Sequence, residues 1–129
     1  MKLTDQQIAL LNEPNYAVVA TVDERGRPRS TVVWVDTDGE AVRFNTTTTR
    51  AKARHLAANP YVSVLIVDRN DFYRWVEVQG RAETTQEGAD EHIDGLSRKY
   101  DGKEYSSWRE HETRVTALLT PERVDATGI

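Results

Sequence analysis

The chain has 129 residues, a length that suits one domain spanning 1–129 and is too short for two of ordinary size. Hydrophobic residues make up 38% and the net charge is −4, which excludes wholesale disorder and disfavours nucleic acid as a partner. Cysteine is absent, so disulfides, thiolate metal ligands and cysteine nucleophiles are excluded. With no apolar run near the roughly 20 residues of a membrane helix and no apolar N-terminal stretch, we expect a cytoplasmic protein without a membrane partner.

The first part of the chain alternates short polar turns with β-branched segments. Thr4 is a suitable N-cap for an opening helix, and the Asp38-Gly39 dipeptide is typical of a tight hairpin turn. The predicted elements are, in chain order, a helix over 4–11 and strands over 16–22, 29–36 and 41–45. The first two strands should form a hairpin.

The remainder mixes helical and alternating patterns. The run 61–67 is apolar on both faces, so a buried central strand is predicted there, and Gly80 marks a bulge in the strand that follows. In chain order we predict a helix over 49–59 with Ala53, Leu56 and Ala57 as its apolar stripe, strands over 61–67 and 72–83, a helix over 85–100 with Ala89, Ile93 and Leu96 inward, a strand over 112–120 and a last edge segment over 121–125. This order is typical of a small, mainly antiparallel barrel with flanking helices.

The charges are unevenly distributed around the helix predicted over 49–59. Between residues 41 and 67 there is no Asp or Glu, although the stretch contains Arg43, Arg50, Lys52 and Arg54. Cations in the first turn of a helix oppose its dipole, whereas four preceding threonines and free backbone N–H groups suit a phosphate. The residues alone leave two interpretations open: an anion site, or a threonine-capped helix with solvated cations.

Three aromatic residues provide surfaces for a flat ring, although Trp34 and Trp75, each taken alone, are more typical of a core or a subunit interface. Trp34 lies in the second predicted strand, and Tyr73 and Trp75 share one face of the strand over 72–83. The histidines lack metal-ligand spacing, and no nucleophile motif is present. We therefore expect no metal and no catalytic side chain, with the chemistry carried by a bound cofactor.

Several segments together resemble one family. They are the hairpin 26–35, the strand-to-helix segment 45–60, the long strand 73–82, and the pair 98–100 and 120–124. In order and spacing they resemble the pyridoxamine-phosphate-oxidase-like split β-barrel flavoproteins over residues 13–127. The Arg-x-Lys-x-Arg element and the closing Thr-Pro-Glu-Arg-Val are most similar to the deazaflavin branch, the coenzyme F-420-dependent reductases.

This resemblance implies a mainly β split barrel that forms a homodimer with a cofactor at each subunit interface. It implies that Arg50 and Lys52 hold the cofactor phosphate, that Thr46 and Thr47 donate hydroxyls to it, and that Arg54 assists or meets the acidic tail. The residues implied to line the ring pocket are Thr31, Val32, Val33, Trp34 and Tyr73. The implied reaction is hydride transfer from reduced coenzyme F-420 to a small electron-poor acceptor such as a quinone, enone, nitroaromatic or tetrapyrrole.

Other interpretations stay open at this stage. FMN could take the place of coenzyme F-420, because the same cations bind either phosphate. A non-catalytic cofactor-binding protein and a nucleic-acid module using the basic segment are further alternatives, the latter disfavoured by net charge. The segment 124–129 lacks the basic C-terminal motif of pyridoxamine phosphate oxidases, so we do not expect pyridoxamine phosphate as the substrate.

Overall fold

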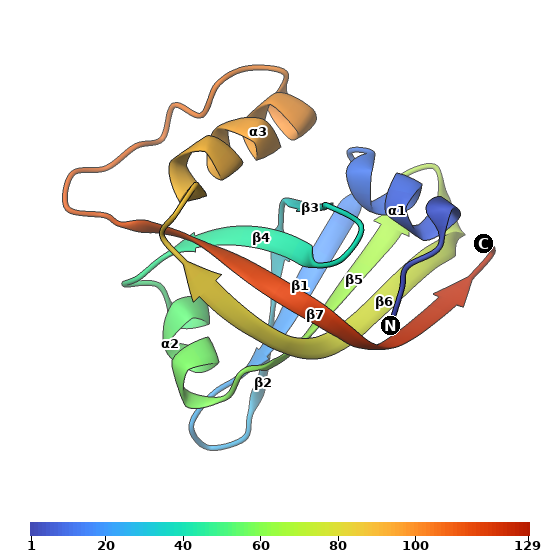
Figure 1. The fold of residues 1–129 in the computed structure, drawn as a ribbon, viewed down its shortest axis with the longest axis horizontal. Coiled ribbons are helices and arrows are strands. Elements are labelled where there is room, and N and C mark those ends of the chain that lie inside the picture. The colour runs from blue at the N-terminus through green and yellow to red at the C-terminus, as the bar shows by residue number, and fades with distance from the viewer.

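The computed structural model describes residues 1–129, in which one seven-stranded antiparallel sheet curls into a split barrel with three helices around it (Figure 1). In chain order the elements are α1 (Asp5–Asn12), β1 (Tyr16–Val22), β2 (Pro28–Val33), β3 (Val35–Thr37), β4 (Val42–Thr47), α2 (Ala51–Ala58), β5 (Tyr61–Asp68), β6 (Asp71–Thr85), α3 (Ala89–Asp101) and β7 (Arg114–Thr127). The mainly β fold with flanking helices that the sequence predicts is confirmed.

The strand predicted over 29–36 is wrong as one element, because it breaks at Trp34 into β2 and β3. The strands are ordered β2-β1-β5-β6-β7-β4-β3, so β2 pairs with β1 at one end of the sheet and β3 pairs with β4 at the other. A single residue thus connects the two ends. Burying one face of every strand around a common interior requires this break, and local strand propensity does not reveal it.

The two longest strands, β6 and β7, pair along almost their whole length and carry the predicted bulge. The register shifts between Gln79 and Gly80, and a Cβ on Gly80 would lie 2.0 Å from the carbonyl oxygen of Thr120. The segment predicted as a separate edge piece, 121–125, is instead continuous with β7. It pairs only with β6, because β4 begins at Val42 opposite Leu119 and does not reach this segment.

Three helices cover different parts of the barrel. Leu10 and Leu11 of α1 and Leu56 of α2 enter the main core from opposite ends of the curled sheet (Figure 1). Thr4 caps α1 as predicted and forms a capping box with Gln7. In α2, however, His55 is buried and Ala57 is exposed, contrary to the predicted stripe.

The third helix lies over β4 and β7, outside the barrel (Figure 1). It begins at Ala89 rather than at residue 85, because β6 continues to Thr85 and Gly88 turns the chain at φ 73°. Ala89, Ile93 and Leu96 are buried as predicted. None of the three helices has the length and apolar character that a membrane crossing requires.

One face of the sheet is left uncovered. In β5, Val62, Val64 and Ile66 are buried in the core, but Leu65 and Val67 point outward and are only half-buried. The prediction that this strand is buried on both faces is therefore wrong for the single chain.

Candidate functional site

A cavity of about 220 Å³ lies between α3, the β2–β3 junction and the start of α2. Its lining joins segments far apart in the chain: Val32, Val33, Trp34, Asn45, Arg50, Lys52, Ile93, Leu96, Tyr105 and Arg114. Apolar groups from α3 and β2 form one part of the wall, and three cations form another. An apolar wall with a few polar groups is typical of ligand pockets.

The start of α2 supplies two of these cations. Arg50 is the N-cap residue and makes no side-chain capping bond, so the first N–H groups of the helix remain available. The ammonium of Lys52 lies 3.3 Å from the Thr31 hydroxyl. Burial lowers the pKa of Lys52, and the charges of Arg50 and Arg29 lower it further. No carboxylate pairs with any of these cations. The local field therefore favours an anion.

The third cation, Arg114, was not identified from the sequence. It begins β7 opposite Thr47, and the backbone N–H of Thr48 donates to the carbonyl of Thr113 beside it. Only 7% of Arg114 is exposed, yet its Nε and Nη1 have no hydrogen-bond partner. The ring of Tyr105 lies 5.0 Å from the guanidinium carbon.

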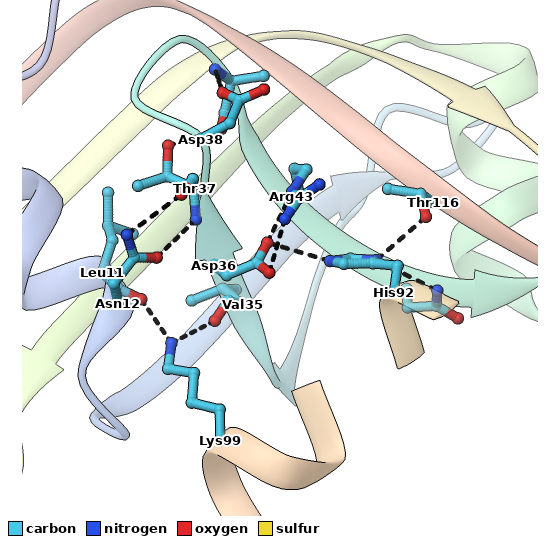
Figure 2. A network of polar contacts seen from close by, with 12 residues as sticks. Leu11, Asn12, Val35, Asp36, Thr37, Asp38, Arg43, His92, Lys99 and Thr116 are labelled. Atoms are coloured by element: carbon cyan, nitrogen blue, oxygen red, sulfur yellow. Dashed lines mark hydrogen bonds and ion pairs between the residues drawn. The ribbon is translucent and has the colours of Figure 1, made fainter. Parts of the chain in front are cut away.

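A polar network behind the cavity orients Asn45. His92 Nε2 lies 3.0 Å from the Asp36 carboxylate, and Arg43 donates to the same carboxylate at 2.8 and 2.9 Å (Figure 2). With its proton on Nε2, His92 accepts at Nδ1 from Thr116 and from the Asn45 amide. The Asn45 amide also donates to the carbonyl of Ala89, which leaves Asn45 Oδ1 buried without a donor.

The electrostatics of this network keep Asp36 ionised. Burial by itself would raise the pKa of Asp36, but hydrogen bonds and charge from His92 and Arg43 hold it below its usual value. The pair is worth more than an exposed ion pair because both oxygens are bonded in a partly buried site.

Tyr100 and Lys99 of α3 contact the β2–β3 junction without lining the cavity. The rings of Trp34 and Tyr100 stack with centroids 5.7 Å apart and planes inclined by 6°. Burial raises the pKa of Tyr100 to about 12. Lys99 donates to the carbonyls of Leu11 and Val35, which ties α3 to α1 and β3 (Figure 2).

The structure brings together half of the site residues predicted from the sequence. Val32, Val33, Trp34, Arg50 and Lys52 line the cavity, and Thr31 contacts Lys52 from beside it. The two cations thus share one cavity with Trp34, as the predicted combination of an anion site with an aromatic requires.

The other four predicted residues lie outside the cavity. Thr46 is fully buried on the core face, and Thr47 is fully buried with its hydroxyl 3.4 Å from that of Thr49. Arg54 turns back to donate to the carbonyl of Thr49 at 2.6 Å. Tyr73 is 80% exposed at the start of β6 and does not line the cavity. In a single chain, these four side chains do not contribute to the cavity wall.

Sequence reasoning missed Asn45, Tyr105 and Arg114. One signal was available: Asn45 directly precedes the threonine run. Arg114 and Tyr105 had none, because the polar segment 102–113 resembles an ordinary solvated loop and only tertiary packing buries Arg114.

Residues 3–128 match the family described as pyridoxamine 5'-phosphate oxidase. A pyridoxine/pyridoxamine 5'-phosphate oxidase of Paraburkholderia xenovorans is 36% identical over 121 residues, which are 89% of this chain and 55% of that protein. One of Streptomyces avermitilis is 38% identical over 104 residues, which are 80% of this chain and 45% of that protein. The chain spans about half the length of these curated relatives.

Solved structures extend the comparison. A protein titled F420 reductase superposes with a TM-score of 0.84 at 31% identity, covering 95% of this chain and 98% of the other. A putative pyridoxamine 5'-phosphate oxidase of Listeria innocua superposes with a TM-score of 0.74 at 20% identity over 95% of each chain, which shows the shared fold alone. The sequence match, the split barrel and the superpositions agree, and the chain therefore belongs to the pyridoxamine 5'-phosphate oxidase family.

Proposed function

We propose that this protein is a cytoplasmic oxidoreductase that binds coenzyme F-420 in the cavity and passes its hydride to a small electron-poor organic acceptor, of the quinone, enone, nitroaromatic or tetrapyrrole class. The observation that carries the proposal is the cluster of Arg50, Lys52 and Arg114 on one cavity without a carboxylate partner. Full-length likeness to a protein titled F420 reductase favours the deazaflavin.

The residues present fit a phosphorylated, planar group. Arg50 and Lys52 would hold the phosphate, with help from the uncapped N–H groups of α2. The apolar wall of Val33, Ile93 and Leu96 would exclude water from the ring. When bound, the reduced coenzyme supplies a hydride. The protein contributes position, a dry surface and complementary charge.

FMN is the second candidate cofactor. The curated relatives are named as pyridoxine/pyridoxamine 5'-phosphate oxidases, and the cation cluster suits any phosphate monoester. The phosphate of FMN would bind the same cations, and Arg114 would then contact oxygens of the ring or of the substrate.

A homodimer would complete the site. The cavity of about 220 Å³ is smaller than the roughly 300–1,000 Å³ of typical ligand pockets, so a coenzyme would extend beyond it. The uncovered outer face of the sheet offers the surface for a second copy. Strand register places Val32, Val18 and Leu65 in one row and Tyr16, Val67 and Trp75 in another. In such a dimer, Tyr73 would be presented to the partner rather than to its own cavity.

Titration with coenzyme F-420 and FMN under identical conditions tests the assignment. Quenching or enhancement of cofactor fluorescence gives the affinity, and loss of reduced coenzyme in the presence of an enone or quinone gives turnover. Tighter FMN binding would overturn the deazaflavin assignment. Tight coenzyme binding without turnover of any acceptor class would leave a cofactor-binding protein rather than an enzyme.

A further inference from the structure

Arg114 has no structural explanation within the chain. A buried guanidinium normally pairs with a carboxylate or donates to carbonyls, because burial removes the water that would solvate its charge. Here Nε and Nη1 have no partner, and Nη2 has only the Tyr105 hydroxyl at 3.4 Å. Removing Arg114 would therefore break no strong contact.

Neighbouring acids do not fill this role. Asp90, Glu91 and Glu112 border a hollow on the other side of Arg114, but none of them forms an ion pair with it. The guanidinium instead lines the cavity together with Arg50 and Lys52. A chain that retains an unpaired, buried cation at a cavity wall is arranged for an anion from outside.

We propose that Arg114 is a second oxyanion-binding residue of the cavity, which takes a carboxylate or phosphate group distinct from the phosphate held by Arg50 and Lys52. Asn45 lines the same cavity, and its Oδ1 is also buried without a donor. Asn45 pairs with Thr116 and is thus the diagonal cross-strand neighbour of Arg114, about 7–8 Å away on the same face. A ligand with an oxyanion and a nearby N–H or O–H donor satisfies both residues.

Tyr105 contacts the Arg114 guanidinium with its aromatic ring. Its ring stacks on the guanidinium, and Trp108 packs edge-to-face against Tyr105 at 5.1 Å. The aromatic pair orients the planar guanidinium and leaves its Nε and Nη1 donors free. This inference rests on the proposed function for the identity of the ligand, which carries its second acidic group either on the cofactor tail or on the acceptor.

The first experiment needs no cofactor. In the ligand-free chain, Arg114→Met removes an unpaired buried charge while keeping apolar length, so the melting temperature should rise. Arg109→Met, which removes an exposed arginine of the loop before β7, should leave it unchanged. A fall in melting temperature for Arg114→Met, with rescue by Arg114→Lys, would show a structural role and overturn the proposal.

The second experiment uses inorganic phosphate as the probe, in an Arg50→Met/Lys52→Met background that removes both cations of the first phosphate site. Phosphate should still raise the melting temperature of this variant, and adding Arg114→Met should abolish the remaining shift. The same shift in both proteins would overturn the oxyanion role of Arg114. This result is independent of coenzyme F-420 and FMN, so it separates failure of this inference from failure of the proposed function.

The third experiment distinguishes the sources of the second acid. If the acid is on the cofactor tail, Arg114→Met weakens coenzyme F-420 binding at least tenfold. The same substitution then leaves unchanged the affinity for a deazaflavin that lacks both the phosphate and the tail. If it is on the acceptor, cofactor affinity is unchanged and the KM of a carboxylate-bearing acceptor rises at least tenfold while that of its methyl ester does not. No change in either measurement would overturn the assignment.

Discussion

The carboxylate of Asp36 on β3 lies 3.0 Å from Nε2 of His92 on α3, although the two residues are 56 positions apart. This contact holds α3 against the outer face of β4 and β7, where the cavity lies. Through His92 it also fixes which way the Asn45 amide points. The network is therefore a positioning device behind the site as well as a stabilising one.

Asp36→Asn should destabilise the protein by about 2–3 kcal/mol, because the partly buried acceptor of the hydrogen bonds from Arg43 and His92 loses its charge. Hydrogen bonds lower the pKa of Asp36, so the stability it contributes is present above the ordinary Asp value and is lost as pH falls through the lowered one. Urea unfolding at pH 7 and below 4 should show a smaller acid loss in Asp36→Asn than in the wild type. As a control, Glu104→Gln removes an exposed pair with Arg98 and should change stability by at most about 1 kcal/mol. Equal losses in the two variants would contradict this account.

Arg50→Ala and Lys52→Ala should each weaken cofactor binding by about 1.5–3 kcal/mol, the scale of a charge-assisted hydrogen bond, with the fold retained. Arg25→Ala, an exposed cation in the β1–β2 turn, should bind normally. Wild-type affinity in both Arg50→Ala and Lys52→Ala would place the phosphate elsewhere.

The lowered pKa of Lys52 gives the same site a pH dependence. An anion favours the protonated amine, so affinity should fall as pH rises through that lowered value. Lys52→Arg stays charged and should keep its affinity at alkaline pH. Parallel pH profiles for the wild type and Lys52→Arg would show that Lys52 does not bear the charge that the ligand meets.

Lys99 predicts an alkaline gain in stability. Burial lowers its pKa to about 8, partly opposed by the charges of Asp36 and Glu13. Between that value and the ordinary 10.5, the folded protein has released a proton that the unfolded chain keeps, so stability rises with pH. The difference in unfolding free energy between wild type and Lys99→Met should therefore increase from pH 7.5 to 9.5, whereas Lys103→Met should match the wild-type slope. A pH-independent difference for Lys99→Met would refute the assignment.

Gly80→Ala should destabilise the protein by at least about 3 kcal/mol, because its Cβ would lie 2.0 Å from the Thr120 carbonyl oxygen and the backbone must move. Gly95→Ala is the matched control. In the middle of α3 its nearest neighbour would be the Arg98 side chain at 3.8 Å, so stability should rise by up to about 1 kcal/mol. Thermal unfolding of both variants measures this contrast. If Gly80→Ala and Gly95→Ala changed stability by similar amounts in the same direction, the bulge would not explain why position 80 is glycine.

Leu65→Asp should separate the proposed homodimer while each subunit stays folded, since Leu65 is only half-buried in the single chain. Sedimentation velocity should give a dimer for the wild type and a monomer for the variant, and circular dichroism should be unchanged. Ser106→Asp places the same charge in an exposed loop and should remain dimeric. A monomeric wild type would end the dimer proposal.

Local patterns predicted most elements because their causes are local. Thr4 caps its helix, Asp38-Gly39 turns the chain, and Gly80 marks the bulge. The cations at positions 50 and 52 were also found from sequence, since the absence of acids around a helix start is visible without coordinates.

What only tertiary structure decided is which segments meet. Trp34 divides one apparent strand between the two ends of the sheet, a choice made by closure of the barrel rather than by propensity. Arg114 becomes a site residue because β7 places it under α3 and beside Thr47, and burial then removes the water that an exposed arginine would keep. Local interactions determined the elements of this protein, whereas long-range pairing and burial determined which charges face the cavity.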